Sequence, residues 1–257
     1  MFSLNRTFIN IFFIFVVTII NYDSIFSVNS PKNNIDGRNI IILCFHDING
    51  DGKYSISEEE FIEILDMLKT KYEVYSLKDW YFKIQNHEKF KKQPIVLTFD
   101  DGYASIFSIA IPLLKKYKFG ATFFIYLEKY ENQPWIFKEM ASLPDNFEIG
   151  SHSFSHSDME KLFKSNKKKF YKEIFLSRKK LEFLIGKTVV SWAWPYGAYT
   201  KDMIQMADEA GYKIQVNTDY KNTEKEAETT SFSRYTVQNP DPVDQTREIL
   251  LKNSSYQ

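Results

Sequence analysis

Residues 95–102 read Ile-Val-Leu-Thr-Phe-Asp-Asp-Gly, a short apolar run that ends in two acidic residues and a glycine. The run Ile95–Phe99 is short and does not alternate with polar residues, so it predicts a strand buried on both faces, as in a parallel sheet. Parallel sheets place their ligand sites at the carboxyl ends of the strands, where Asp100 and Asp101 follow this one. Asp-Asp-Gly is also an ordinary turn sequence, so this motif alone does not assign a function.

The same strand pattern recurs along the chain and alternates with helical patterns. Residues 40–45 predict a second buried strand, and residues 58–71 predict a helix because Phe61, Leu65 and Leu68 recur at helical spacing. Further strands are predicted over residues 121–127, 147–150, 189–193 and 212–216, and further helices over residues 106–116 and 161–185. Short connections between these elements predict an α/β fold, a parallel sheet or barrel with helices outside it.

The predicted helix over residues 161–185 has two unlike faces. Its buried face is predicted to hold Phe170, Ile174, Ser177, Leu181 and Ile185. Its opposite face is basic and carries Lys167, Lys168, Lys169, Arg178, Lys179 and Lys180. We expect a solvated face, with a docking site for an anionic polymer as the alternative. Residues 219–230 are polar without apolar periodicity and predict an exposed loop.

The composition is that of a folded protein. The chain has 257 residues, of which 44% are hydrophobic and 26% charged, and this excludes intrinsic disorder for its bulk. Basic and acidic residues number 33 each, so no positive excess points to nucleic acid as a partner. Cys44 is the single cysteine, which excludes a disulfide framework and a cysteine-based zinc site and predicts a small buried core residue. We expect a monomer with a single folded domain.

The N-terminus has the layout of an export signal. Arg6 precedes a strongly apolar stretch from Phe8 to Ile20, and small residues follow at Ser27 and Ser30. Residues 1–30 therefore predict a cleaved signal peptide or, alternatively, an uncleaved membrane anchor over residues 8–28. Either alternative places residues 31–257 outside the cytoplasm, as an extracellular, cell-surface or periplasmic domain that contacts the membrane only through the N-terminal segment.

A second polar cluster reads Ser-His-Ser-Phe-Ser-His over residues 151–156. Its histidines, His152 and His156, lie four residues apart, a spacing at which two imidazole nitrogens can converge on one cation. A pair of surface histidines is the alternative. Together with a carboxylate from Asp100 or Asp101, the histidines would complete a three-ligand site that leaves positions open for water and substrate, which indicates a hydrolytic metal centre.

A third segment, Ala-Trp-Pro-Tyr-Gly over residues 193–197, completes a recognisable order of motifs. Thr-Phe-Asp-Asp-Gly, then His-Ser-x-x-His, then Pro-Tyr-Gly resembles the polysaccharide deacetylases of carbohydrate esterase family 4, the NodB-homology domain. The resemblance extends over residues 40–237. It implies that residues 31–257 form one distorted (β/α) barrel, and that the chain removes N-acetyl groups from amino-sugar polymers with the help of a metal ion.

The resemblance also implies roles for individual residues. Asp101, His152 and His156 would hold a divalent metal ion, for which the ligand set suits Zn²⁺, Co²⁺, Ni²⁺ or Fe²⁺. Asp100 would be the general base that deprotonates the attacking water. The groove would be lined by Trp194, Pro195, Tyr196 and Gly197. The backbone N–H of Tyr196 would point at the developing oxyanion.

Two departures from the family's usual pattern point to one subgroup. Ala193 stands where the third motif usually opens with an arginine, and no histidine follows His156 to supply the usual general acid. Exported deacetylases of biofilm poly-N-acetylglucosamine resemble circularly permuted members in which the acid histidine follows the first strand. His46 fits that role, and Arg234 is the candidate that orients Asp100; a core histidine and a surface arginine are the alternatives. The implied substrate is poly-N-acetylglucosamine, and peptidoglycan or chitin oligomers are the nearest alternative substrates.

Two other functions stay open from the sequence. A catalytically weak or inactive carbohydrate-binding protein on the same scaffold would explain the missing arginine and the displaced acid. Residues 47–58 match the EF-hand calcium pattern, which would make the chain a calcium-binding surface protein. However, an EF-hand needs a helix before its loop, and a buried strand is predicted there. The alternative is a hydrophilic connection in which Ser57 is the N-cap and Glu60 completes a capping box.

Overall fold

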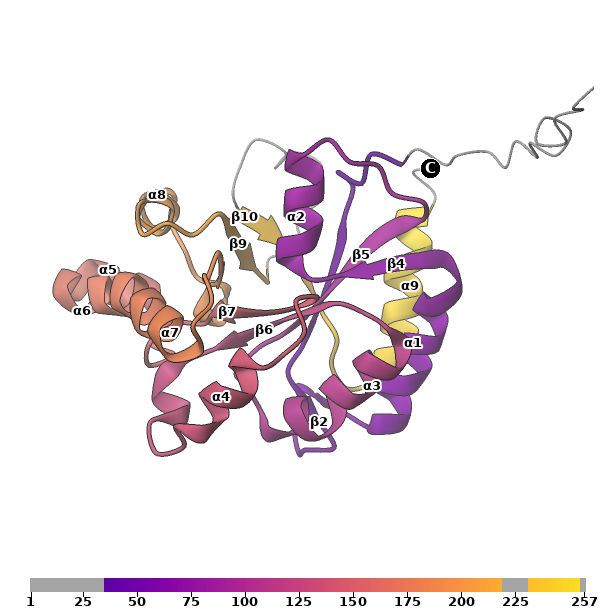
Figure 1. Ribbon diagram of the computed structural model, residues 1–257, viewed down its shortest axis with the longest axis horizontal. Helices are drawn as coiled ribbons and strands as arrows, with labels where there is room; N and C mark the ends of the chain where they lie inside the picture. Colours follow the sequence, from indigo (N-terminus) through magenta and orange to yellow (C-terminus); the bar gives the residue numbers. More distant parts are fainter. Residues whose placement is uncertain (1–34, 219–230, 255–257) are drawn as a thin grey trace, which may run out of the picture. The chain divides into compact units, whose positions relative to one another are not determined.

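The computed structural model describes residues 35–218 and 231–254, and its centre is a sheet of nine strands (Figure 1). The sheet strands are β1 (Ile41–Phe45), β4 (Tyr72–Tyr75), β5 (Gln93–Phe99), β6 (Ala121–Ile125), β7 (Phe147–Ser151), β8 (Ser191–Ala193), β9 (Ile214–Asn217), β10 (Ser231–Ser233) and β11 (Tyr235–Thr236). Their order is β10-β9-β8-β7-β6-β5-β1-β11, with β4 beside the first half of β5, and every one of these pairings is parallel. The prediction of a parallel sheet is confirmed.

The two edges of this sheet are joined by a single residue, Arg234. The strand before it, β10, pairs with β9, and the strand after it, β11, pairs with β1 at the other edge. The sheet therefore nearly closes into a barrel, and the chain crosses the remaining gap at Arg234. This is the distorted (β/α) barrel that the sequence predicts.

Helices cover the outside of the barrel (Figure 1). The α-helices are α1 (Glu58–Lys71), α2 (Leu77–Gln85), α3 (Ile111–Tyr117), α4 (Trp135–Ala141), α5 (Met159–Ser165), α6 (Lys167–Tyr171), α7 (Ser177–Ile185), α8 (Lys201–Glu209) and α9 (Pro242–Ser254). Shorter helical turns are η2 (Ile106–Ala110) and η4 (Lys172–Leu176), both π-helical, and η3 (Leu127–Tyr130) and η5 (Pro195–Gly197), both 3₁₀. α1 packs against α3 and α9, and α4 packs against α7.

Side chains of β1 alternate between two apolar clusters, as the pleat of a strand requires. Ile41, Leu43 and Phe45 face the helices and pack with the buried side of α1. Ile40 and Ile42 belong to a second cluster, which gathers residues of the other strands and of α2. Cys44 lies on the same side of β1 as Ile42, and this inward-facing row leads on to His46.

The predicted strands are all present, each within two residues of its predicted ends. The predicted helix over residues 58–71 is α1, and its N-terminus has the predicted capping box: Ser57 Oγ accepts from the backbone N–H of Glu60, whose carboxylate accepts from the backbone N–H of Ser57. The patterns did not predict β4, α2, α4, α8 or α9.

One continuous helix over residues 161–185 is a wrong prediction. α5 ends at Ser165, and Asn166 leaves helical geometry and caps α6 through its side chain, which accepts from the backbone N–H of Lys169. The predicted buried positions are nevertheless correct, since Phe170, Ile174, Ser177, Leu181 and Ile185 are all buried. All five lie after Asn166, within α6, η4 and α7, where the chain is helical throughout.

Two predictions lie outside the described residues: the signal or anchor over residues 1–30, and the loop over residues 219–230. Within residues 35–218 and 231–254, no helix is both long enough and apolar enough to cross a membrane.

Candidate active site and metal centre

The predicted site residues gather at the carboxyl ends of the parallel strands. Asp100 and Asp101 follow β5, His152 follows β7, and His46 follows β1. Arg234 lies between β10 and β11, where the barrel closes. Residues that are far apart in the sequence therefore meet because their strands end at one rim.

Three ligating atoms lie close together at this rim. Asp101 Oδ1 is 3.4 Å from His152 Nε2 and 3.2 Å from His156 Nε2, and the two histidine nitrogens are 3.1 Å apart. Zinc with ligands about 2.0–2.1 Å away would place those ligands at tetrahedral edges of about 3.3 Å. The triangle therefore has the size that a tetrahedral divalent ion needs.

Two further observations fit a cation at this triangle. The Nδ1 of His152 donates to the Ala193 carbonyl at 2.9 Å, so its Nε2 keeps a lone pair for a ligand. Asp101 Oδ1 is buried and has no hydrogen-bond donor among the described residues, although a buried carboxylate oxygen without a partner is costly. These residues fit a metal ion.

The charges of the site also favour a cation. Burial raises the pKa of Asp101, but the close approach of His152 and His156 outweighs burial and holds that pKa well below its usual range. Burial lowers the pKa of His152, but the carboxylates of Asp100 and Asp101 outweigh burial and raise that pKa. Two carboxylates thus impose a negative potential on the histidines.

Arg234 holds Asp100 in one orientation. Its Nη1 and Nη2 each donate to one Asp100 oxygen at 2.7 Å, and it donates further to Thr98 Oγ1 at 3.0 Å and to the Asn217 carbonyl at 3.1 Å. Burial raises the pKa of Asp100, but the guanidinium outweighs burial and holds that pKa at about 2. A surface position for Arg234, the alternative from sequence, is wrong, since this side chain is buried.

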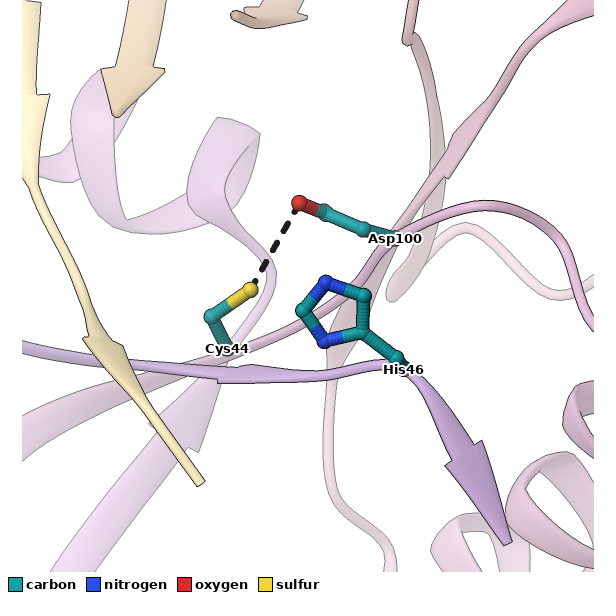
Figure 2. Close-up of side chains that lie close together, drawn as sticks. All are labelled: Cys44, His46 and Asp100. Atoms are coloured by element: carbon teal, nitrogen blue, oxygen red, sulfur yellow. Dashed lines mark hydrogen bonds between the residues drawn. The ribbon is translucent and has the colours of Figure 1, made fainter. Parts of the chain in front are cut away.

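Cys44 and His46 lie next to Asp100 (Figure 2). The Cys44 thiol donates to Asp100 Oδ2 at 3.5 Å, and burial raises the pKa of this thiol well above its usual range. Cys44 is buried as predicted, but its contact with Asp100 was not predicted. Burial lowers the pKa of His46 more than Asp100 and Asp101 raise it. The His46 Nδ1 is buried and has no partner among the described residues.

The third motif forms a strained turn beside the metal-ligand triangle. Tyr196 has φ 58° and Gly197 has φ 69°, and a Cβ at Gly197 would collide with Thr218 Oγ1. The Tyr196 ring is 70% exposed and packs against His156, with ring centroids 4.7 Å apart. Asp101 and His156 also have positive φ. Strained residues gather at functional sites, where the surrounding structure holds them in place.

A cavity of about 480 Å³ opens over these residues. Its lining consists of His46, Lys53, Tyr54, Asp100, Asp101, His152, His156, Trp194, Tyr196, Gly197, Thr218, Thr236 and Gln238. The indole of Trp194 is buried and donates to Gln215 Oε1 at 3.1 Å, so it offers no stacking face. Tyr54, which sequence reasoning missed, is 47% exposed and stacks on His46 with centroids 4.9 Å apart.

Tyr54 comes from the segment that matches the EF-hand pattern. Strand β1 precedes this segment, and two short paired strands, β2 (Asp47–Ile48) and β3 (Ser55–Ile56), frame it, so no helix enters the loop. The Asn49 side-chain oxygen already accepts from the backbone N–H of Glu58 at 2.8 Å. Among the described residues, neither of the two clusters of close ligating side chains includes this loop. The segment forms one wall of the cavity.

Comparison with known proteins agrees with this geometry. A family model described as polysaccharide deacetylase matches residues 87–215, half of the chain. The chain belongs to the polysaccharide deacetylase family. The match covers Asp100, Asp101, His152 and His156, whereas His46 and Arg234 lie outside it, on the strands that complete this deacetylase barrel.

Two curated relatives are informative. The poly-beta-1,6-N-acetyl-D-glucosamine N-deacetylase of Staphylococcus aureus is 29% identical over 177 residues, which cover 62% of this chain and 60% of that protein. YxkH of Bacillus subtilis is 25% identical over 183 residues, which cover 69% of this chain and 64% of its own length. This polysaccharide deacetylase chain therefore spans less than two thirds of the length of the curated relatives that it matches.

Solved structures show the same barrel. The Streptococcus pyogenes deacetylase PplD is 24% identical, with a TM-score of 0.70 over 83% of this chain and 97% of that one. IcaB from Ammonifex degensii is 22% identical, with a TM-score of 0.71 over 84% of this chain and 98% of that one. Their likeness shows that the polysaccharide deacetylase chain has the deacetylase fold.

Proposed function

We propose that the chain is a metal-dependent N-deacetylase of amino-sugar polysaccharides, with β-1,6-linked poly-N-acetylglucosamine as its substrate. The observation that carries this proposal is the triangle of Asp101, His152 and His156 beside Asp100, a carboxylate held by two hydrogen bonds from Arg234. A divalent ion held by the triangle would polarise the substrate's amide carbonyl and lower the pKa of water. Zn²⁺, Co²⁺, Ni²⁺ and Fe²⁺ all suit this ligand set.

The chain's own residues supply the proton transfers. The pKa of Asp100 at about 2 keeps it ionised throughout the physiological range, and Arg234 keeps its oxygens in place, so it can accept the proton of the attacking water. Water adds to the amide carbon and the C–N bond breaks, which gives acetate and a free amine. His46 lines the same cavity, and we assign to it the proton donated to the amine. The Tyr196 backbone N–H is assigned to the oxyanion.

Two aromatic rings support a carbohydrate substrate. Tyr54 and Tyr196 are exposed in the cavity, where Tyr54 stacks on His46 and Tyr196 packs against His156 in a T-shaped arrangement. Each tyrosine can therefore offer a ring face to a sugar close to the reacting groups. The β-1,6 linkage is proposed because the Staphylococcus aureus relative carries that name. Peptidoglycan and chitin oligomers are the other substrates to test.

The location of the enzyme follows from the N-terminal pattern. We propose that residues 1–30 direct export, as a cleaved signal or a membrane anchor, and that residues 31–257 form the deacetylase domain, a monomer outside the cytoplasm. A carbohydrate-binding protein that has lost catalysis is the weaker alternative. The third motif lacks its usual arginine, but Arg234 supplies a guanidinium to Asp100 from another part of the chain.

The decisive experiment measures acetate release from β-1,6-linked N-acetylglucosamine oligomers by the full-length chain in detergent. We expect release that stops with chelator, returns with Zn²⁺ or Co²⁺, and is lost in Asp100→Asn. Chitin and peptidoglycan oligomers run in parallel, and faster release from either would move the substrate proposal to that polymer. Binding of all three polymers without acetate release at any metal would instead identify a binding protein.

A further inference from the structure

The loop that carries the two histidines has an unfavourable backbone. Ser153 has φ 78° and His156 has φ 55°, both in the left-handed region. A residue with a Cβ is unfavourable in this region and persists there only where other contacts hold it. His152 is anchored at both ends, because its backbone N–H donates to the Ile125 carbonyl and its ring donates to the Ala193 carbonyl, each at 2.9 Å. The rest of the loop needs its own support.

Glu173 accepts three hydrogen bonds from the loop. The backbone N–H groups of Leu127 and Glu128 add two more, to the carbonyls of Ser153 at 3.4 Å and Phe154 at 2.9 Å. Glu173 lies in the π-helical turn η4 and is only 1% exposed. Its Oε2 accepts from the backbone N–H groups of Phe154 at 2.9 Å and Ser155 at 2.8 Å, and its Oε1 accepts from Ser155 Oγ at 2.7 Å. Two successive backbone N–H groups that converge on one oxygen form an anion-binding nest, here filled by a carboxylate of the same chain.

The charge of Glu173 is balanced by these hydrogen bonds and not by an ion pair within the described part of the chain. Among residues 35–218 and 231–254, no lysine or arginine forms an ion pair with it. A buried carboxylate is costly unless it accepts hydrogen bonds, so Glu173 needs the donors of the loop. The same bonds fix the loop and the Glu173 side chain relative to each other. π-helical turns are rare and are frequent at functional sites, which agrees with a role for η4 in placing Glu173 beside the histidine loop.

The bonds of Glu173 fall between the two histidines. Ser155 directly precedes His156, whose backbone N–H is further held by Ser153 Oγ at 2.8 Å. The conformation of residues 153–155 therefore decides where the ring of His156 lies relative to the separately anchored His152, whose Nε2 is 3.1 Å from that of His156.

We propose that Glu173 is a positioning residue for the metal-ligand loop, and that its carboxylate raises the affinity of the site for a divalent cation by fixing His156. This inference rests on the proposed function, because it takes Asp101, His152 and His156 as the metal ligands. Groups that orient metal ligands from outside the ligand set typically change affinity by about 10–100-fold.

The test is a Co²⁺ titration of the full-length chain in detergent, because the visible spectrum of Co²⁺ reports both affinity and coordination geometry. We expect Glu173→Ala to weaken Co²⁺ binding by about tenfold or more and to change the spectrum. Glu173→Gln should recover most of the affinity and the wild-type spectrum, since its amide oxygen can accept from both N–H groups while its NH₂ donates to Ser155 Oγ.

Glu148→Ala is the matched control for lost stability. Glu148 is also a buried carboxylate, and it accepts from the Lys78 backbone N–H, Thr122 Oγ1 and Ser191 Oγ, with no bond to the loop. We expect Glu148→Ala to lower the melting temperature comparably and to leave Co²⁺ affinity within about twofold of wild type.

The outcomes separate the two proposals. Wild-type Co²⁺ affinity and spectrum in Glu173→Ala would overturn the positioning role and leave the metal site standing. An equal loss of affinity in Glu148→Ala would also overturn it, because lost stability would then explain the effect. Failure of the wild-type chain to bind Co²⁺ or Zn²⁺ would overturn the metal site itself, and the role of Glu173 with it.

Discussion

Replacing Arg234 by methionine tests how the Asp100 carboxylate and the stability of the barrel depend on one ion pair. Methionine fills part of the space but leaves the Asp100 carboxylate, which is buried, without its two charged hydrogen bonds. Removing one partner of a buried ion pair typically costs about 3–5 kcal/mol, because the remaining charge is uncompensated. Asp100 can escape part of this cost by taking up a proton, so we expect a loss near 3 kcal/mol at neutral pH.

The pKa of Asp100 gives a second route to the same magnitude. Its shift from 3.8 to about 2 corresponds to about 2.4 kcal/mol of stability at neutral pH. Because the folded pKa is the lower one, this contribution is present above about pH 4 and is lost as the pH falls through about 2. In Arg234→Met the largest effect that opposes burial is removed, so the pKa of Asp100 rises. The stability deficit of the variant should therefore be largest at neutral pH and smaller near pH 4.

The assay is unfolding of the metal-free, full-length chain, wild type against variant, at pH 7 and near pH 4. A loss of about 3 kcal/mol corresponds to a melting temperature roughly 6–12 °C lower for a domain of this size. The double variant Arg234→Met, Asp100→Asn removes the orphaned charge and should be more stable than Arg234→Met alone. A double variant no more stable than the single one, or a deficit that does not depend on pH, would refute the reasoning.

Three further predictions follow from other contacts. Tyr54→Ala should raise the KM for N-acetylglucosamine oligomers about fivefold, the value of one lost aromatic contact, whereas Phe82→Ala, on a ring of similar exposure outside the cavity, should not. Burial raises the pKa of Glu148, so the folded protein loses stability as the pH rises through that pKa and the buried carboxyl ionises. Glu148→Gln stays neutral, so urea unfolding should show it gaining stability over wild type between about pH 4 and pH 7. Ser57→Ala should cost about 1 kcal/mol by removing the N-cap of α1, seen as a melting temperature about 2–4 °C lower, while Glu60→Gln should cost less.

The sequence predicted the rim of the barrel well for a simple reason. Strands of a parallel sheet are short apolar runs, and polar residues directly after them can only lie at the rim, so Asp100, Asp101 and His152 were found from local pattern. His46 also directly follows a predicted strand, but it was singled out through the resemblance. The local pattern could not place Arg234 at the rim, because β10 and β11 are too short to show a strand pattern. Arg234 was singled out through the resemblance alone.

The features that were missed depend on contacts between distant residues. Glu173 lies in a lysine-rich stretch, where an acidic residue resembles an ordinary surface charge, and its partners are 18 and 19 residues away. Tyr54 was hidden by the calcium-loop pattern, because glycine and acidic residues also satisfy the turn between β2 and β3. Asn166 breaks the helix at a single residue, and the predicted apolar spacing lies wholly after it, so that spacing gives no sign of the break. Periodicity reports which side is buried and not whether the backbone is continuous.

Barrel closure and the orientation of Asp100 depend on the same residue, Arg234. The guanidinium that holds Asp100 belongs to the residue that links β10 at one sheet edge to β11 at the other. β11 pairs with β1, which also carries Cys44 and leads to His46, and the backbone N–H of Asp100 donates to the Phe45 carbonyl at the end of β1. A chain with β11 undocked would keep the triangle of Asp101, His152 and His156 on β5 and β7, but Asp100 would lose its guanidinium. Metal binding and catalysis should therefore be separable by perturbing the last strands, since the ligands and the base depend on different parts of the barrel.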